Sequence, residues 1–143
     1  MKKLVSSIVL AGLLAVPVMA ADKAENLMVV LTSDDSVTQL MAGVLALQSK
    51  KQGANVEMLL CGKAGDLVVK GSTEVKLKPQ GTSPQMLIKK LIGTGSKVGV
   101  CPPYLPNASK TPADLIDGVS VVKPPKIAAS ILDKNTKILS YYF

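Results

Sequence analysis

Two cysteines are the residues of this sequence whose chemistry could go beyond packing. Cys61 and Cys101 are the only cysteines among 143 residues, and the chain contains no histidine. A thiol–histidine nucleophile pair is therefore excluded, and so is a zinc site built from histidine and cysteine. What remains is the chemistry of sulfur itself, a disulfide, or the packing of a small apolar side chain. We predict no metal site and no cofactor.

Each cysteine stands at the end of a short apolar segment. Cys61 ends NVEMLLC (55–61), and Cys101 ends SKVGVC (96–101) with two prolines directly after it. Proline has no backbone N–H for a strand ladder, so the strand must stop at Cys101. The carboxyl ends of parallel strands share one edge of a sheet, where ligands and catalytic groups gather. The sequence therefore predicts both thiols at this edge, with Cys101 as the first catalytic candidate and Cys61 as the second thiol.

Three interpretations of the two cysteines stay open on the sequence alone. Each can pack as a small apolar side chain in the core. The two can form a stable disulfide in an oxidising compartment, which requires their strands to be neighbours. Alternatively, Cys101 acts as a nucleophile or sulfur carrier, and a reversible disulfide with Cys61 forms during turnover.

Three lysines are the positive charges nearest to the cysteines in the sequence: Lys63, Lys97 and Lys110. A neighbouring positive charge lowers the pKa of a thiol and favours the thiolate or a persulfide. We take these lysines, together with Tyr104 in the loop after Cys101, as candidate binding residues. A small anion bound at the sheet edge would use the same lysines. The alternative for each lysine is an ordinary solvated charge.

The composition argues against nucleic-acid binding. The net charge of +7 comes from lysine alone, because the chain has no arginine, and it has only three tyrosines and one phenylalanine as aromatic residues. Nucleic-acid binders normally use arginine for bidentate contacts to bases and phosphates. The moderate positive charge is better suited to a small anion, an acidic partner or simple solubility.

The N-terminus is typical of a secretory signal peptide. Two lysines open the chain, an apolar run follows (4–18), and small residues end it at Ala20. We expect cleavage after Ala20, which lowers the net charge to +5 and leaves 21–143 as a single domain in the periplasm, without a stable membrane span. The alternative is an uncleaved N-terminal anchor, although the apolar run is shorter than the roughly 20 residues that a membrane span needs.

The remaining chain alternates apolar runs with segments of helical period. The predicted strands are 26–32, 55–61, 96–101, 119–122 and 136–143. The predicted helices are 34–53, 83–95, 111–118 and 124–135, with a turn of helix at 62–71. A polar surface loop is expected at 72–82 and no regular structure at 102–110. This order predicts an α/β domain of three layers, α/β/α, around a mostly parallel sheet of about five strands.

Local signals mark the ends of these helices. The helix at 34–53 opens on Asp34 and Asp35, and its apolar residues recur at spacings of three and four, which predicts an amphipathic helix. Ser83 can cap the helix at 83–95, with a proline at its first position. Thr111 can cap the helix at 111–118 in the same way.

Three segments together resemble the DsrE/DsrF-like (YchN-like) family over residues 26–143. They are LTSDDSVTQLMAGVLALQSKKQGANVEMLLCGKAG, SPQMLIKKLIGTGSKVGVCPPYLPN and DLIDGVSVV, in this order and spacing. The resemblance implies a compact α/β domain with a central parallel sheet of about five strands, assembled into trimers or hexamers. It also implies sulfur relay, because the best-understood relatives take up a persulfide sulfur on a cysteine and pass it to a partner cysteine.

The resemblance assigns the carrier role to Cys101, because LIGTGSKVGVC matches the element that precedes the carrier cysteine in those relatives. Cys61 matches no such role. The sulfur-relay relatives work in the cytoplasm, whereas this chain has the N-terminus of an exported protein. Residues and resemblance together therefore predict an exported, periplasmic member that handles sulfur as a carrier or a sulfurtransferase-like protein.

The predicted partners are further copies of the chain, as a homotrimer or homohexamer, and a protein that donates or accepts sulfur. Two other function classes stay open. One is a non-enzymatic, oligomeric binding or scaffold protein with structural cysteines. The other is a binder of small anions.

Overall fold

Five parallel strands form the centre of the structure, a computed structural model that describes residues 25–142. The predicted signal peptide, 1–20, lies outside the described residues. The strand order is β4-β3-β2-β1-β5, and every neighbouring pair is parallel. The strands are β1 Asn26–Leu31, β2 Asn55–Leu60, β3 Lys97–Val100, β4 Val119–Val121 and β5 Thr136–Tyr141. The predicted α/β class and parallel sheet are confirmed.

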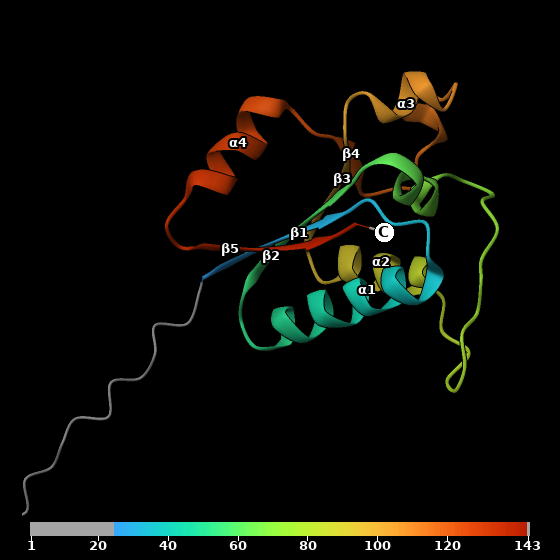
Figure 1. Ribbon diagram of the computed structural model, residues 1–143, viewed down its shortest axis with the longest axis horizontal. Helices are drawn as coiled ribbons and strands as arrows, with labels where there is room; N and C mark the ends of the chain where they lie inside the picture. Colours follow the sequence, from blue (N-terminus) through green and yellow to red (C-terminus); the bar gives the residue numbers. More distant parts are fainter. Residues whose placement is uncertain (1–24, 143) are drawn as a thin grey trace, which may run out of the picture.

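Helices cover both faces of the sheet, which gives the three predicted layers (Figure 1). Helices α1 (Ser36–Lys51) and α2 (Pro84–Gly93) lie on one face, and α4 (Pro124–Leu132) lies on the other. The chain order explains this division. Strands β1 to β4 follow one another across the sheet in one direction, whereas β5 returns to the far side of β1. Because crossovers between parallel strands are right-handed, the reversed step places α4 on the opposite face.

The two faces carry apolar clusters of very different size. The larger cluster lies between the sheet and the pair α1–α2, and alternate residues of the inner strands, such as Val29, Met58 and Val98, point into it. The smaller cluster lies on the α4 face and consists of Met28, Leu59 and Ile127, with both cysteines packed against it. The cysteines therefore lie where the sheet is only thinly covered.

Side chains cap the two longer helices as the sequence predicts. Asp35 accepts a hydrogen bond from the backbone N–H of Thr38 at 2.7 Å and so caps α1. Ser83 accepts one from the backbone N–H of Met86 at 3.1 Å and caps α2, whose first residue is Pro84. Each cap gives a partner to an N–H group that the helix itself leaves without one.

The amphipathic pattern of α1 does not identify its packed face. The buried residues of this helix are mostly small: Gln39, Ala42, Gly43, Ala46 and Leu47. A Cβ on Gly43 would lie 2.9 Å from the Cβ of Leu87, so α1 and α2 approach each other closely there. The larger apolar side chains point outward instead, and Val37 is 63% exposed, with Met41 and Leu45 on the same stripe. The helix was predicted correctly, but of its large apolar residues only Leu47 is buried in the core.

Two predictions about the segment after Cys101 are wrong. Residues 102–110 were expected to lack regular structure, but Tyr104–Asn107 forms a single helical turn, α3. Prolines are tolerated there because the N–H groups of a first helical turn need no partner within the helix. The helix expected at 111–118 is only the three-residue 3₁₀ turn η2, Pro112–Asp114, although Thr111 caps it as expected, in a capping box with Asp114.

The helix at η2 ends early because the chain turns into the core. Leu115 is buried and adopts an extended backbone. The N–H of Ile116 donates to the carbonyl of Val68 at 2.9 Å, so the segment pairs with the end of the 3₁₀ helix η1 (Gly62–Val68). These contacts come from far along the chain and override the local helical signal.

No helix within residues 25–142 is long and apolar enough to cross a membrane.

Candidate functional site

Cys61 and Cys101 are joined by a disulfide at the carboxyl ends of β2 and β3. The register of the two strands explains why they meet. Leu60 lies beside Val100 in the parallel ladder, so the next residues along each strand are the two cysteines. The N–H of Cys101 donates to the carbonyl of Leu60 at 2.9 Å, which holds the pair in this register. The Cα atoms are 5.2 Å apart, within the usual range for a disulfide.

A cleft of about 620 Å³ opens beside the disulfide. We call it the cysteine cleft. Both cysteines are half-buried and line this cleft. The chain turns sharply after Cys101, whose carbonyl accepts a hydrogen bond from the N–H of Tyr104 at 3.0 Å. The cleft is lined by Cys61, Gly62, Lys63, Asp66, Cys101, Pro103, Tyr104, Asn107 and Ala108.

Tyr104 links the two short helices that form the cleft. Its hydroxyl donates a hydrogen bond to Oδ1 of Asp66 at 2.7 Å, which connects α3 to η1. The ring is only 7% exposed and lies so close to Gly65 that a Cβ there would be 2.5 Å from ring atoms. Burial of the ring raises the pKa of Tyr104 above its ordinary value. The hydrogen bond to Asp66 and the negative charge of the Asp66 carboxylate raise it further.

The raised pKa of Tyr104 predicts a loss of stability at alkaline pH. The protonated hydroxyl stabilises the fold fully below the unfolded pKa of about 10, and this contribution is lost as the pH rises through the higher folded pKa. Near neutral pH, Tyr104→Phe should lower the free energy of unfolding by about 1 kcal/mol, the usual net value of a hydrogen bond. Its stability should fall less steeply above pH 10 than that of the wild type.

Denaturant unfolding across this pH range measures the effect as a difference between variant and wild type. Tyr142→Phe, at a tyrosine that is 62% exposed, is the matched control. If the free energy of unfolding of Tyr104→Phe falls as steeply above pH 10 as that of the wild type, the raised pKa does not belong to Tyr104.

The structure separates the predicted binding residues into two groups. Lys63 and Tyr104 line the cysteine cleft itself. Lys110 lines a second cavity of about 470 Å³ that also has Lys63 and Asp66 in its wall. Lys97 was expected near the cysteines but is the first residue of β3, where the backbone pairs with Glu57 at the start of the β2–β3 ladder. Lys97 therefore lies at the end of the sheet where the strands begin, opposite the end where the cysteines lie, and this expectation is wrong.

Lys97 misled the sequence argument because it stands only four positions before Cys101 in the sequence. In an extended strand each residue advances the chain by about 3.3 Å, so closeness in sequence becomes a distance of roughly 13 Å. Asp66 was missed for the converse reason. Its sequence signal is a single carboxylate five positions after Cys61, and only the fold of η1 brings it to the cleft beside Lys63.

The arrangement combines an accessible disulfide with a lysine, a carboxylate and a buried tyrosine hydroxyl. Thiol–disulfide exchange and transfer of sulfur between thiolates both need an attackable sulfur and groups that stabilise negative charge. Among residues 25–142 there is no group of three or more cysteine, aspartate or glutamate residues placed to hold a metal ion.

Comparison with known proteins identifies the fold. No protein-family model matches the sequence, and no curated protein matches it significantly. Solved structures of similar fold include three proteins. The YchN protein from E. coli has a TM-score of 0.67 at 18% identity, covering 82% of this chain and 98% of that one. A conserved protein of unknown function from Bacteroides thetaiotaomicron has a TM-score of 0.63 at 23% identity, covering 85% of this chain and 100% of that one.

A protein of unknown function from Methanobacterium thermoautotrophicum is similar as well. It has a TM-score of 0.60 at 18% identity, covering 81% of this chain and 98% of that one. At these identities the likeness concerns the fold and not the activity. The resemblance inferred from the sequence is thus confirmed in three dimensions, and the chain has the α/β fold of YchN-like proteins.

Proposed function

We propose that this protein is a periplasmic sulfur carrier that works through Cys61 and Cys101. The observation that carries the proposal is that the only two cysteines of the chain meet at the carboxyl edge of the sheet and line a cleft. A cysteine pair used only for packing needs no cleft beside it. Ligands of open parallel sheets bind at this edge, which supports a functional role for the sulfur atoms.

The first step of the proposed cycle reduces the disulfide. A dithiol protein supplies two electrons and two protons, so Cys61 and Cys101 become thiols and the partner leaves with its own disulfide. The Cys101 thiolate then attacks the outer sulfur of a persulfide donor. A new S–S bond forms on Cys101, the S–S bond of the donor breaks, and the donor leaves as a thiolate while the proton stays on the transferred sulfur.

The sulfur can leave Cys101 by two routes. An acceptor thiolate can take the outer sulfur, which leaves Cys101 as a thiolate again. Alternatively, the Cys61 thiolate attacks the inner sulfur, the disulfide forms again, and hydrosulfide leaves. The second route requires the two sulfur atoms to be within bonding distance, as they are in this structure. Lys63, in the wall of the same cleft, supplies a positive charge that stabilises thiolate and persulfide anions.

Export and self-association belong to the same proposal. The signal peptide predicted at 1–20 would deliver the chain to an oxidising compartment, where the disulfide is the resting state. Further copies of the chain would cover the apolar side chains that the described monomer exposes. These include Ile131 and Leu132 on α4 and Ile138 on the edge strand β5. Exposed apolar patches of this kind commonly mark protein–protein contacts.

A structural disulfide in an oligomeric binding protein is the second candidate. The bond itself favours it, because it fastens the ends of β2 and β3 where α4 covers the sheet thinly. Titration of native, reduced protein with a thiol reagent separates the two candidates. Thiols that react only after denaturation would favour the structural role.

Sulfur uptake gives the direct test. Reduced wild-type protein, freed of reductant and incubated with a persulfide donor, should gain the mass of one sulfur atom. Cys101→Ser should gain none, because the attacking thiolate is missing. Intact-protein mass spectrometry measures both. Absence of added sulfur on Cys61→Ser, which cannot resolve the persulfide, or equal addition to Cys101→Ser, would refute the proposal.

A further inference from the structure

We propose that the cavity next to the cysteine cleft binds the charged part of a small amino-acid or peptide thiol, so that its sulfur reaches Cys101. We call it the lysine cavity; its wall includes Asp34, Lys63, Asp66, Lys70, Gln85 and Lys110. The inference rests on the proposed function and names the class of compound that donates or accepts the sulfur.

The two cavities form adjoining parts of one surface. Lys63 and Asp66 line both of them, so a ligand that passes these two side chains can extend from one cavity into the other. Their volumes, about 470 Å³ and 620 Å³, each fall within the range of small-molecule sites. The cysteine cleft offers sulfur and the ring of Tyr104, whereas the lysine cavity offers charged groups. A ligand with a thiol at one end and charges at the other matches this division.

The charges of the lysine cavity indicate which groups the ligand carries. Three ammonium groups, from Lys63, Lys70 and Lys110, stand against two carboxylates, from Asp34 and Asp66. One oxygen of Asp66 is already bound by the hydroxyl of Tyr104. The balance favours a ligand with carboxylates, and the remaining acidic groups suit an ammonium. Amino-acid and short peptide thiols carry both.

Lys70 is held in position before any ligand binds. Its Nζ donates a hydrogen bond to the carbonyl of Ala113 at 2.9 Å, and its backbone N–H donates to the carbonyl of Asp114 at 2.8 Å. An ammonium group has three donors, so two remain for a carboxylate. A fixed donor loses less conformational freedom on binding than a mobile one.

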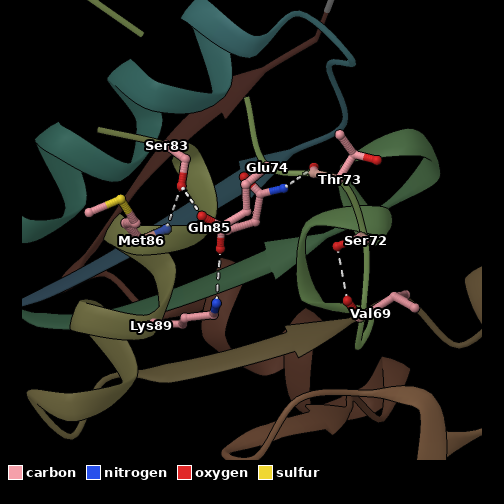
Figure 2. A network of polar contacts seen from close by, with 8 residues as sticks. All are labelled: Val69, Ser72, Thr73, Glu74, Ser83, Gln85, Met86 and Lys89. Atoms are coloured by element: carbon pink, nitrogen blue, oxygen red, sulfur yellow. Dashed lines mark hydrogen bonds and ion pairs between the residues drawn. The ribbon is translucent and has the colours of Figure 1, made fainter. Parts of the chain in front are cut away.

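Gln85 supplies a second observation that points to a ligand. The side chain is only 5% exposed, and its Nε2 donates to the carbonyl of Thr73 at 2.7 Å (Figure 2). Its Oε1 is buried and, within the part of the chain that the structure describes, has no hydrogen-bond partner. A buried acceptor left without a donor costs about 1–3 kcal/mol. Because Gln85 borders the lysine cavity, a rotation of its amide toward the cavity would let an N–H group of a bound amino acid or peptide supply the missing donor.

The wall around Gln85 is fixed by its own polar contacts. Ser83 donates a hydrogen bond to Glu74 at 3.2 Å, and Lys89 forms an ion pair with the same carboxylate at 3.0 Å (Figure 2). These contacts fasten the segment before α2 to the helix itself. The orphan oxygen of Gln85 therefore belongs to an organised wall rather than to a loose loop.

The test uses S-methylglutathione, a peptide thioether that carries the charged groups but cannot exchange sulfur. It should bind to the oxidised wild type in a calorimetric titration. The double variant Lys70→Gln/Lys110→Gln should bind it about tenfold or more weakly, as expected for losing charge-assisted hydrogen bonds. Lys110→Gln alone keeps the contact of Lys70 to Ala113 and should show an intermediate loss. Lys97→Gln, at the opposite edge of the sheet, removes the same charge and should bind like the wild type.

A kinetic arm links this binding to the sulfur atoms. Reduction of the Cys61–Cys101 disulfide by glutathione should slow in the double variant, whereas reduction by uncharged mercaptoethanol should not change. Equal loss in Lys97→Gln, or no binding of the thioether to the wild type, would overturn the inference. Neither arm needs a persulfide. A protein that takes up sulfur but shows no charge preference refutes only the lysine cavity, and one that binds the thioether but takes up no sulfur refutes only the carrier role.

Discussion

Replacing Cys61 with serine should leave a lasting persulfide on Cys101 and stop the release of hydrosulfide. In the reduced wild type, the Cys61 thiolate can attack the inner sulfur of the Cys101 persulfide, because the two residues follow the paired positions Leu60 and Val100. A serine hydroxyl is a far weaker nucleophile than a thiolate at neutral pH. The intramolecular route therefore closes, and the added sulfur stays until an external thiol removes it.

Two measurements after loading with a persulfide donor test this prediction. The amount of released sulfide reports the resolving step, and the intact mass reports whether the persulfide stays on the protein. Loaded wild type should release one equivalent of sulfide and return to the disulfide, whereas Cys61→Ser should release none in the same time. Cys61→Ala is the second variant, because it removes the nucleophile without adding a hydroxyl. Cys101→Ser is the control that should never load. Release by Cys61→Ser at the wild-type rate would show that Cys61 does not resolve the persulfide.

Reducing the disulfide should lower the free energy of unfolding by about 4 kcal/mol. The bond closes a loop over a sequence separation of 40, and the chain-entropy account gives this magnitude for such a loop. Domains of this size have unfolding free energies of about 5–15 kcal/mol. The reduced protein should therefore stay folded with a smaller margin, as a working sulfur carrier requires.

Guanidinium unfolding with and without a phosphine reductant measures this difference. Cys61→Ser is the matched control, because it has no disulfide to lose and its stability should not respond to the reductant. Identical stability of oxidised and reduced wild type would contradict the prediction. A reduced wild type that no longer folds would instead support the purely structural role of the bond.

Much of the local structure could be predicted from the sequence. Continuous apolar runs located the strands, and Asp35 and Ser83 marked the starts of α1 and α2 because capping depends only on residues within one turn. The prolines after Cys101 ended β3 for an equally local reason. The errors arose where distant contacts decide. Leu115 leaves the predicted helix because it packs into the core, and η2 ends after three residues.

The sequence also did not predict which face of a helix packs on the sheet. The large apolar residues of α1 gave the helical period, yet apart from Leu47 the buried apolar residues are the small ones, Ala42, Gly43 and Ala46. Small residues are needed there because α2 lies close to α1 at Gly43 and Leu87. The sequence contains the period of a helix, whereas the partner helix determines which face it buries.

The sequence by itself determined that two cysteines stand at the ends of strands, since strand ends follow from local patterns of apolar residues and prolines. Only the tertiary structure decided that β2 and β3 are neighbours in a register that joins Cys61 to Cys101. It also brought Asp66 and Tyr104 to the cleft and placed Lys97 at the far edge. The physical reason is that residues close in sequence lie far from each other along an extended strand. Sheet pairing, in contrast, brings together residues that are 40 positions apart in the sequence.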